Sequence, residues 1–125
     1  MSTTLERFQG ATLSLAKSAH IKERLTDAYR NHLALILEDE LPSELRDEFR
    51  ELGRVLTREP PLLRGEDSFR ATVRKMSSDD ADDIAYRVVR LFAMLSRAQA
   101  GLSRQKTSKS VQNVVPLYLA EASPA

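Results

Sequence analysis

The sequence contains no cysteine and no tryptophan, and only four glycines and five prolines among its 125 residues. A chain without thiols forms no disulfide, thiolate metal site, iron–sulfur cluster or cysteine nucleophile. Its glycines are too scattered to build a loop that cradles a phosphate, and none of the common nucleotide-binding, hydrolase or zinc-protease motifs is present. We therefore expect no catalytic residue, no metal and no cofactor.

The sequence also lacks an excess of positive or of negative charge. The sequence has 19 lysines and arginines and 18 aspartates and glutamates, which gives a formal net charge of +1. This net charge does not indicate binding to nucleic acid or to an anionic membrane. No apolar run approaches the ~20 residues of a bilayer span. The first ten residues carry Glu6 and Arg7 where the apolar core of a secretory signal would begin. These observations predict a cytoplasmic protein without a membrane partner.

Apolar residues recur at helical spacing, which predicts an all-α fold. We expect a compact bundle of four to five helices with a flexible C-terminal tail. The expected helices are one capped by Thr3 or Thr4, then 19–40, 42–57, a short one capped by Asp67 or Ser68, and 78–100 capped by Ser77 or Ser78. The expected core residues are Leu25, Ile36, Phe49, Leu52, Val88, Leu91 and Phe92. Whether the first two helices are continuous is left open.

The composition changes after Gly101, where the last helix is expected to end or to fray. We divide the chain into a helical bundle domain at 1–102 and a flexible basic linker with an apolar segment at 103–125. The apolar residues of that segment are candidate interaction residues: Val114, Val115, Leu117, Tyr118 and Leu119. They either fold back into a groove of their own bundle or dock on another chain, and both remain open.

Two polar groups have a functional and a structural interpretation. Four aspartates at 79–83 resemble a cation site, but they lie at a helix start, where the helix dipole favours negative charge. His20, Glu23 and Asp27 share one helical face and could form a ligand trio or an acid–base relay. The structural interpretation is favoured in both cases, with His20 at a solvated helix start and His32 in or near the core.

The basic residues are concentrated in one part of the sequence, although the net charge is close to zero. Residues 84–120 hold six bases and no acid, whereas 38–51 hold seven acids against two arginines. The aspartates at the start of the last helix disfavour base readout by that helix, because phosphates would repel them. The alternative function is therefore backbone binding to nucleic acid, with these candidate contacts: Arg87, Arg90, Arg97, Lys106 and Lys109.

Two stretches carry a resemblance: Leu41-Pro42-x-Glu44-Leu45-Arg46-x-Glu48-Phe49, and Arg64-Gly65-Glu66-Asp67 followed by 71–77. Together they resemble small uncharacterised helical proteins of Gram-negative bacteria, over roughly residues 1–100. The resemblance implies a bacterial cytoplasmic setting and no particular activity. From the residues we predict a non-enzymatic interaction or regulatory protein that self-associates, as a homodimer or with another protein partner.

Overall fold

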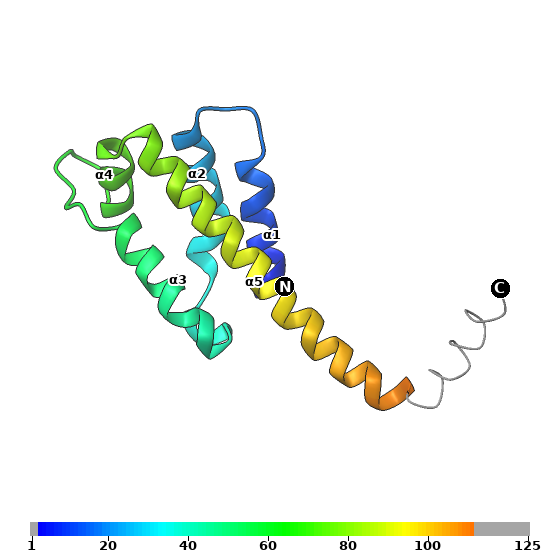
Figure 1. The fold of residues 1–125 in the computed structure, drawn as a ribbon. Coiled ribbons are helices and arrows are strands. Elements are labelled where there is room, and N and C mark those ends of the chain that lie inside the picture. The colour runs from blue at the N-terminus through cyan, green and yellow to red at the C-terminus, as the bar shows by residue number, and fades with distance from the viewer. Residues whose placement is uncertain (1–2, 112–125) are drawn as a thin grey trace. The chain divides into compact units, whose positions relative to one another are not determined.

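The computed structural model describes the backbone of residues 3–111 and the side chains of residues 3–101. These residues form helices and no strand (Figure 1). The α-helices are α1 (Thr4–Leu15), α2 (Ile21–Asn31), α3 (Ser43–Leu56), α4 (Ser68–Lys75) and α5 (Ser78–Val111), and two short 3₁₀ helices, η1 (Leu33–Leu35) and η2 (Glu38–Glu40), lie between α2 and α3. The predicted all-α bundle is confirmed. Internal contacts divide the chain into two units, Met1–Leu95 and Ser96–Ala125, and each is considered by itself.

Side chains at the predicted positions cap three helices. The Thr3 hydroxyl accepts the Glu6 backbone N–H at 3.1 Å, and the Glu6 carboxylate accepts the Thr3 N–H at 3.0 Å, which forms a capping box for α1. Asp67 caps α4 by accepting the Arg70 N–H at 2.8 Å. Ser77 accepts the Asp80 N–H at 3.0 Å at the start of α5. Each cap satisfies a backbone donor that the helix leaves unpaired.

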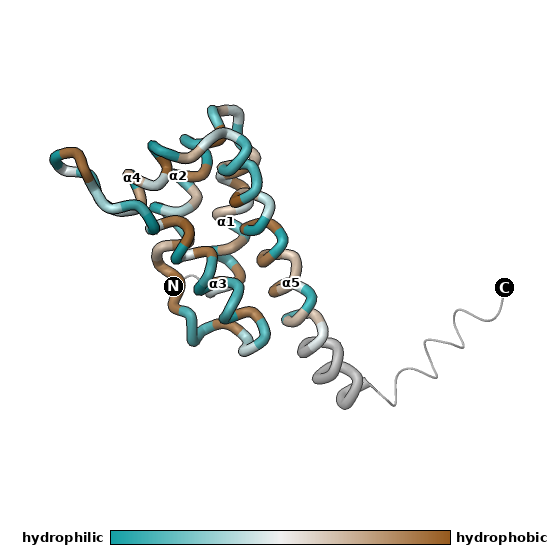
Figure 2. Tube along the Cα trace, turned by 60° about the vertical axis from the view of Figure 1, so that its left-hand side comes forward, coloured by the Kyte–Doolittle hydropathy of each residue, from teal (hydrophilic) through white to brown (hydrophobic). Residues whose placement is uncertain are grey.

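One hydrophobic core fills the unit Met1–Leu95. Hydrophobic residues recur between hydrophilic ones along its helices (Figure 2). Of the predicted core residues, the buried ones are Leu25, Ile36, Leu52, Val88 and Leu91. The other two are only partly buried at its margin, Phe49 and Phe92. Phe49 still contacts the core through Phe8, edge to face, with ring centroids 5.9 Å apart.

The predicted second helix at 19–40 is wrong in its C-terminal half. α2 begins at Ile21 and ends at Asn31, and the chain continues through η1 and η2. The break buries Leu33, Ile36 and Leu41 and leaves Leu37 exposed, a pattern that one straight helix would not give. It also removes three consecutive acids, Glu38–Glu40, from a helix C-terminus, where the dipole would oppose them. The first two helices are separate, since residues 16–20 lie between them.

The expected end of the last helix at Gly101 is also wrong, because α5 continues to Val111. One glycine costs a helix only about 1 kcal/mol relative to alanine, and Arg104, Gln105 and Lys106 favour helix. The boundary between domains at residue 102 stays a prediction. None of the helices in the described part of the chain has the length and apolar character of a bilayer span.

Candidate interaction surfaces

The loop between α3 and α4, residues 57–67, projects from the bundle and has a hydrophobic tip (Figures 1 and 2). Leu62 and Leu63 lie in this tip with 66% and 57% of their surface exposed. They follow two prolines, which cannot continue a helix. A turn closes the tip: the Glu66 N–H donates to the Leu63 carbonyl at 3.1 Å, and Gly65 adopts a φ of +75°. Two leucines are thus held in water by an ordered turn.

The Glu66 side chain fixes the backbone of this tip. Only 7% of it is exposed. Its carboxylate accepts the N–H groups of Leu62 and Leu63 at 3.2 and 3.4 Å, and the Arg74 guanidinium of α4 at 2.8 and 3.0 Å. The bonds from Arg74 and then from the two backbone donors lower the pKa of Glu66 to about 2. At neutral pH the carboxylate is therefore charged and ties the leucine backbone to α4.

Both ends of the loop are also anchored to helices. The Glu59 N–H donates to the hydroxyl of buried Thr72 at 3.0 Å, and the Glu59 carboxylate pairs with Lys75 at 3.1 Å. At the other end, Arg30 of α2 donates to Asp67 at 2.6 Å.

The same arginine joins that anchor to the aromatic pair behind it. The Arg30 guanidinium lies 5.0 Å from the centroid of the Phe69 ring, which stacks on Tyr29 of α2 at 4.1 Å. The exposed leucines are therefore held between two fixed anchors.

A hollow of about 430 Å³ lies between α1 and η1. Its apolar rim is formed by Leu13 and Leu35, with 61% and 55% of their surface exposed. The His32 ring lies against the backbone of Gly10, where a Cβ atom would be 2.5 Å from the ring. His32 is half-buried, as predicted. Glycine at position 10 therefore permits the close approach that shapes the floor of this hollow.

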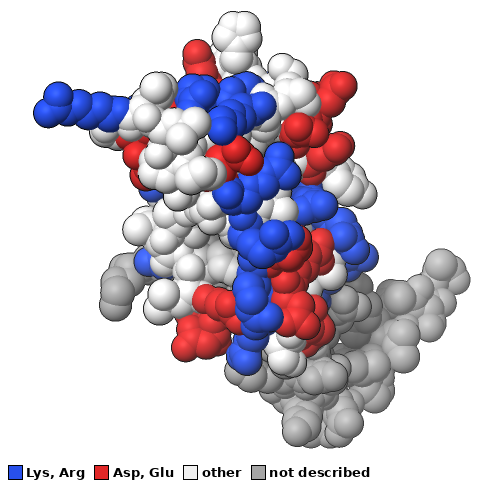
Figure 3. Space-filling view, turned by 90° about the vertical axis from the view of Figure 1, so that its left-hand side faces the viewer, with Lys and Arg blue, Asp and Glu red and all other residues white. Residues whose placement is uncertain are grey.

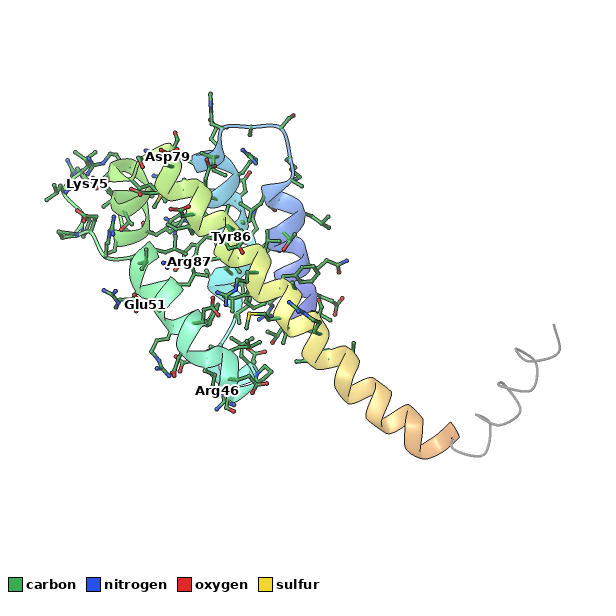
Figure 4. All side chains as sticks on the ribbon, in the orientation of Figure 1. Arg46, Glu51, Lys75, Asp79, Tyr86 and Arg87 are labelled. Carbon is green, nitrogen blue, oxygen red and sulfur yellow. The ribbon has the colours of Figure 1, made fainter. Side chains whose placement is uncertain are left out.

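The basic residues predicted on the last helix lie beside acids. Arg90 donates to Glu48 of α3 at 2.7 Å. Arg87 lines a smaller hollow of about 190 Å³ together with Asp80 and Asp83, and it lies near Glu51 of α3 (Figure 4).

Figure 3 shows acids beside the lysines and arginines across the face that carries α3 and the loop. Arg97 is exposed, and the side chains of Lys106 and Lys109 lie outside the described residues. Of the five predicted nucleic-acid contacts, the structure therefore describes the side chains of three, and two of these, Arg87 and Arg90, lie beside acids.

The polar clusters have structural roles or stay apart. Asp80 belongs to the cap of α5, since its carboxylate accepts the Ser77 N–H at 3.3 Å. His20 is exposed and lies at the N-cap position of α2. Within residues 3–101, no group of three or more histidines and acids is placed to hold a metal ion. His20, Glu23 and Asp27 therefore do not form such a group. The position of His20 at a helix start and the part of Asp80 in the cap of α5 agree with the structural interpretation.

The predicted C-terminal interaction residues lie outside the described residues: Val114, Val115, Leu117, Tyr118 and Leu119. Sequence reasoning missed the leucine pair of the loop and the Glu66–Arg74 contact. A signal for the pair was present in the order Pro60-Pro61-Leu62-Leu63, because leucines between prolines and a turn glycine cannot reach a helical core face. No sequence signal identified Arg74 as the partner of Glu66.

Comparison of the chain with family models, with curated proteins and with solved structures finds no match. The resemblance to helical proteins of Gram-negative bacteria therefore stays a prediction. At the level of class, the protein is an all-α bundle that presents an ordered, exposed apolar loop. What it does has to be inferred from its own side chains.

Proposed function

We propose that the protein is a non-enzymatic helical interaction protein that self-associates through the loop at 57–67. The observation that carries the proposal is the pair Leu62 and Leu63, exposed at the tip of an ordered loop. Two adjacent exposed leucines are unfavourable in water, and their burial against another surface is the favourable step of association. The cytoplasmic setting implied by the resemblance belongs to the same proposal.

The anchors of the loop favour binding because they are formed before any partner arrives. A flexible segment loses conformational entropy when it is immobilised on binding, and this loss lowers affinity. Here Glu66 and Arg74 already hold the backbone of Leu62 and Leu63. The leucines can therefore be buried with little further ordering of the chain.

The arrangement of the carboxylates supports a non-enzymatic role. Glu48, Glu59 and Glu66 each pair with a lysine or arginine on a neighbouring segment. Glu51 pairs with Arg54 within α3, and Asp67 pairs with Arg30. Pairing with a base directs the carboxylate oxygens to a structural partner. These groups stabilise contacts between helices and the loop.

Light scattering of the full chain on a sizing column tests the proposal. We expect a mass that rises with protein concentration between about 10 µM and about 1 mM, the range of weak association through a small contact. The double variant Leu62→Gln/Leu63→Gln keeps both backbone donors to Glu66 and should lower that mass towards the monomer. Tyr86→Gln is the matched control, since Tyr86 is an exposed apolar residue of α5 far from the loop tip.

A loop variant that associates as the wild type does would contradict the proposal, as would a wild-type chain that is monomeric at every concentration. Circular dichroism and thermal unfolding should be the same for the wild type and the loop variant, because both leucines lie outside the core.

A further inference from the structure

We propose that the hollow between α1 and η1 is the receptor for the loop tip of a second copy of this chain, so that Leu62 and Leu63 of one copy pack against Leu13 and Leu35 of the other. This inference rests on the proposed function and names the surface that the loop contacts.

The apolar parts of the two surfaces match in kind. The loop offers two exposed leucines on a convex tip. The hollow carries two exposed leucines at its rim. Its volume of about 430 Å³ has room for two leucine side chains. Joining them removes all four side chains from water at one contact, whereas any other pairing leaves one exposed leucine pair uncovered. Apolar burial is the main favourable term in protein association.

The charges beside the leucines are complementary as well. Arg64 follows Leu63 at the tip and is exposed, and it makes no ion pair with any residue between Thr3 and Gly101. Glu6 lines the hollow. Glu40 lies at the start of α1, where it accepts the Thr4 hydroxyl at 2.9 Å. Hydrogen bonds from the Leu37 backbone and then from Thr4, with a smaller effect of the Arg7 charge, lower the pKa of Glu40.

Arg7, the one lysine or arginine among the described residues that line the hollow, is engaged locally. The Arg7 guanidinium donates to the Leu35 carbonyl. A second copy's Arg64 therefore meets Glu6 of the hollow, with Glu40 at the start of α1, while the basic residue of the hollow is engaged. Complementary charge of this kind fixes orientation and excludes wrong partners more than it raises affinity.

The loop cannot reach the hollow of its own chain. It projects between α3 and α4, and both views place it away from α1 (Figures 1 and 2). Its anchors on Arg30, Thr72 and Arg74 hold it there. The occupant is therefore a second copy, in which the same two surfaces are present. Such a contact joins two different patches, either reciprocally in a closed pair or head to tail.

A mixing experiment with full-length variants tests this arrangement. One variant carries Leu62→Gln/Leu63→Gln and the other carries Leu13→Gln/Leu35→Gln. All four leucines are exposed, so both variants should fold, and glutamine is compatible with α1. Each variant alone should associate at least about tenfold more weakly than the wild type, which is the effect expected from the loss of buried leucine surface.

The equimolar mixture should regain association and stop at a 1:1 complex, because one intact loop then meets one intact hollow. Tyr86→Gln should leave self-association unchanged. A third variant, Val115→Gln/Leu117→Gln, tests whether the C-terminal segment occupies the hollow instead.

The outcomes separate the two proposals. If the loop variant dissociates while the hollow variant associates normally, the hollow is not the receptor, yet self-association through the loop stands. If both single-surface variants dissociate and their mixture stays monomeric, the loop-to-hollow contact is overturned, because the mixture still offers one intact loop to one intact hollow. If the C-terminal variant reproduces the hollow variant and the loop variant has no effect, both proposals fail.

Discussion

Arg74 and Glu66 join α4 to the tip of the preceding loop through two hydrogen bonds, from Nε to Oε2 at 2.8 Å and from Nη2 to Oε1 at 3.0 Å. The same Oε1 atom accepts the backbone N–H groups of Leu62 and Leu63. A guanidinium and a carboxylate in this geometry form a strong and directional pair. One side-chain contact thus controls whether the exposed leucines have a fixed position.

Replacing Glu66 by glutamine should loosen the loop without unfolding the bundle. The amide places a donor against Arg74 and lacks the charge that holds the backbone N–H groups of Leu62 and Leu63. We expect amide hydrogen exchange at these two residues to accelerate by about tenfold, the factor for one lost hydrogen bond to a charged group. Exchange at the buried core of α1 and α2 should not change. Protection of both amides that equals the wild type would show that Glu66 does not fix the tip.

The same carboxylate predicts a pH dependence of stability. Its pKa is about 2 in the folded chain, below its ordinary value of 4.5, because Arg74 and the two backbone donors bind the charged form. The stabilisation is complete above the ordinary pKa and is lost as the pH falls towards 2. The free energy of unfolding, measured by urea titration, should therefore decrease between about pH 5 and about pH 2. The decrease should be smaller in Glu66→Gln, which has no proton to bind at this position.

Two glycines should respond in opposite ways to alanine. Gly65 adopts a φ of +75° in the loop turn, where a Cβ atom costs about 1–2 kcal/mol. Gly53 lies inside α3 with open space around the position of a Cβ, so Gly53→Ala should stabilise by about 0.5–1 kcal/mol. Urea unfolding of both variants measures the difference. An equal effect of the two substitutions would mean that the turn at Gly65 is not held in the left-handed conformation.

The sequence carried enough information to place most helix starts, because caps and apolar spacing are local. Thr3, Asp67 and Ser77 cap the helices that they were expected to cap. The prediction of a second helix as far as Glu40 is wrong, and three acids at its expected C-terminus argue against such a helix. There, the apolar spacing of residues 33–37 fits a helix locally, and only packing against α1 decides the actual path of the chain.

The candidate interaction surfaces are harder to predict from the sequence than the helices are. The loop was predicted from Pro60 and Pro61, but its order depends on Arg74, which lies eight residues from Glu66 in a different element. The hollow depends on Gly10 and His32, which the sequence separates and the fold brings together. In the sequence, Gly10 indicates only a weakened helix. Contacts of this kind follow from tertiary packing, and no local pattern encodes them.

Gly10→Ala should destabilise the protein, although alanine favours helix over glycine. A Cβ atom at this position would lie 2.5 Å from two atoms of the His32 ring, so the ring must leave its site against α1. We expect a loss of about 1 kcal/mol from the displaced packing, measured by urea unfolding. In a His32→Ala background the space is free, and Gly10→Ala should then stabilise by about 0.5–1 kcal/mol. The same sign in both backgrounds would contradict the contact between Gly10 and His32.

The pair of Arg90 and Glu48 predicts the result of a nucleic-acid binding assay. Because Arg90 donates to Glu48 at 2.7 Å, it is engaged within the bundle, and Arg90→Ala should leave the affinity for a short DNA duplex unchanged at every salt concentration. Five side chains on phosphates would instead give a slope of about −4.5 in log affinity against log salt, and the loss of one would reduce its magnitude by about 1. Fluorescence anisotropy of a labelled duplex measures both quantities, with Lys106→Ala/Lys109→Ala as the comparison. A steep slope that Arg90→Ala reduces by that amount would favour nucleic-acid binding over self-association, because Arg90 would then have to release Glu48 to contact a phosphate.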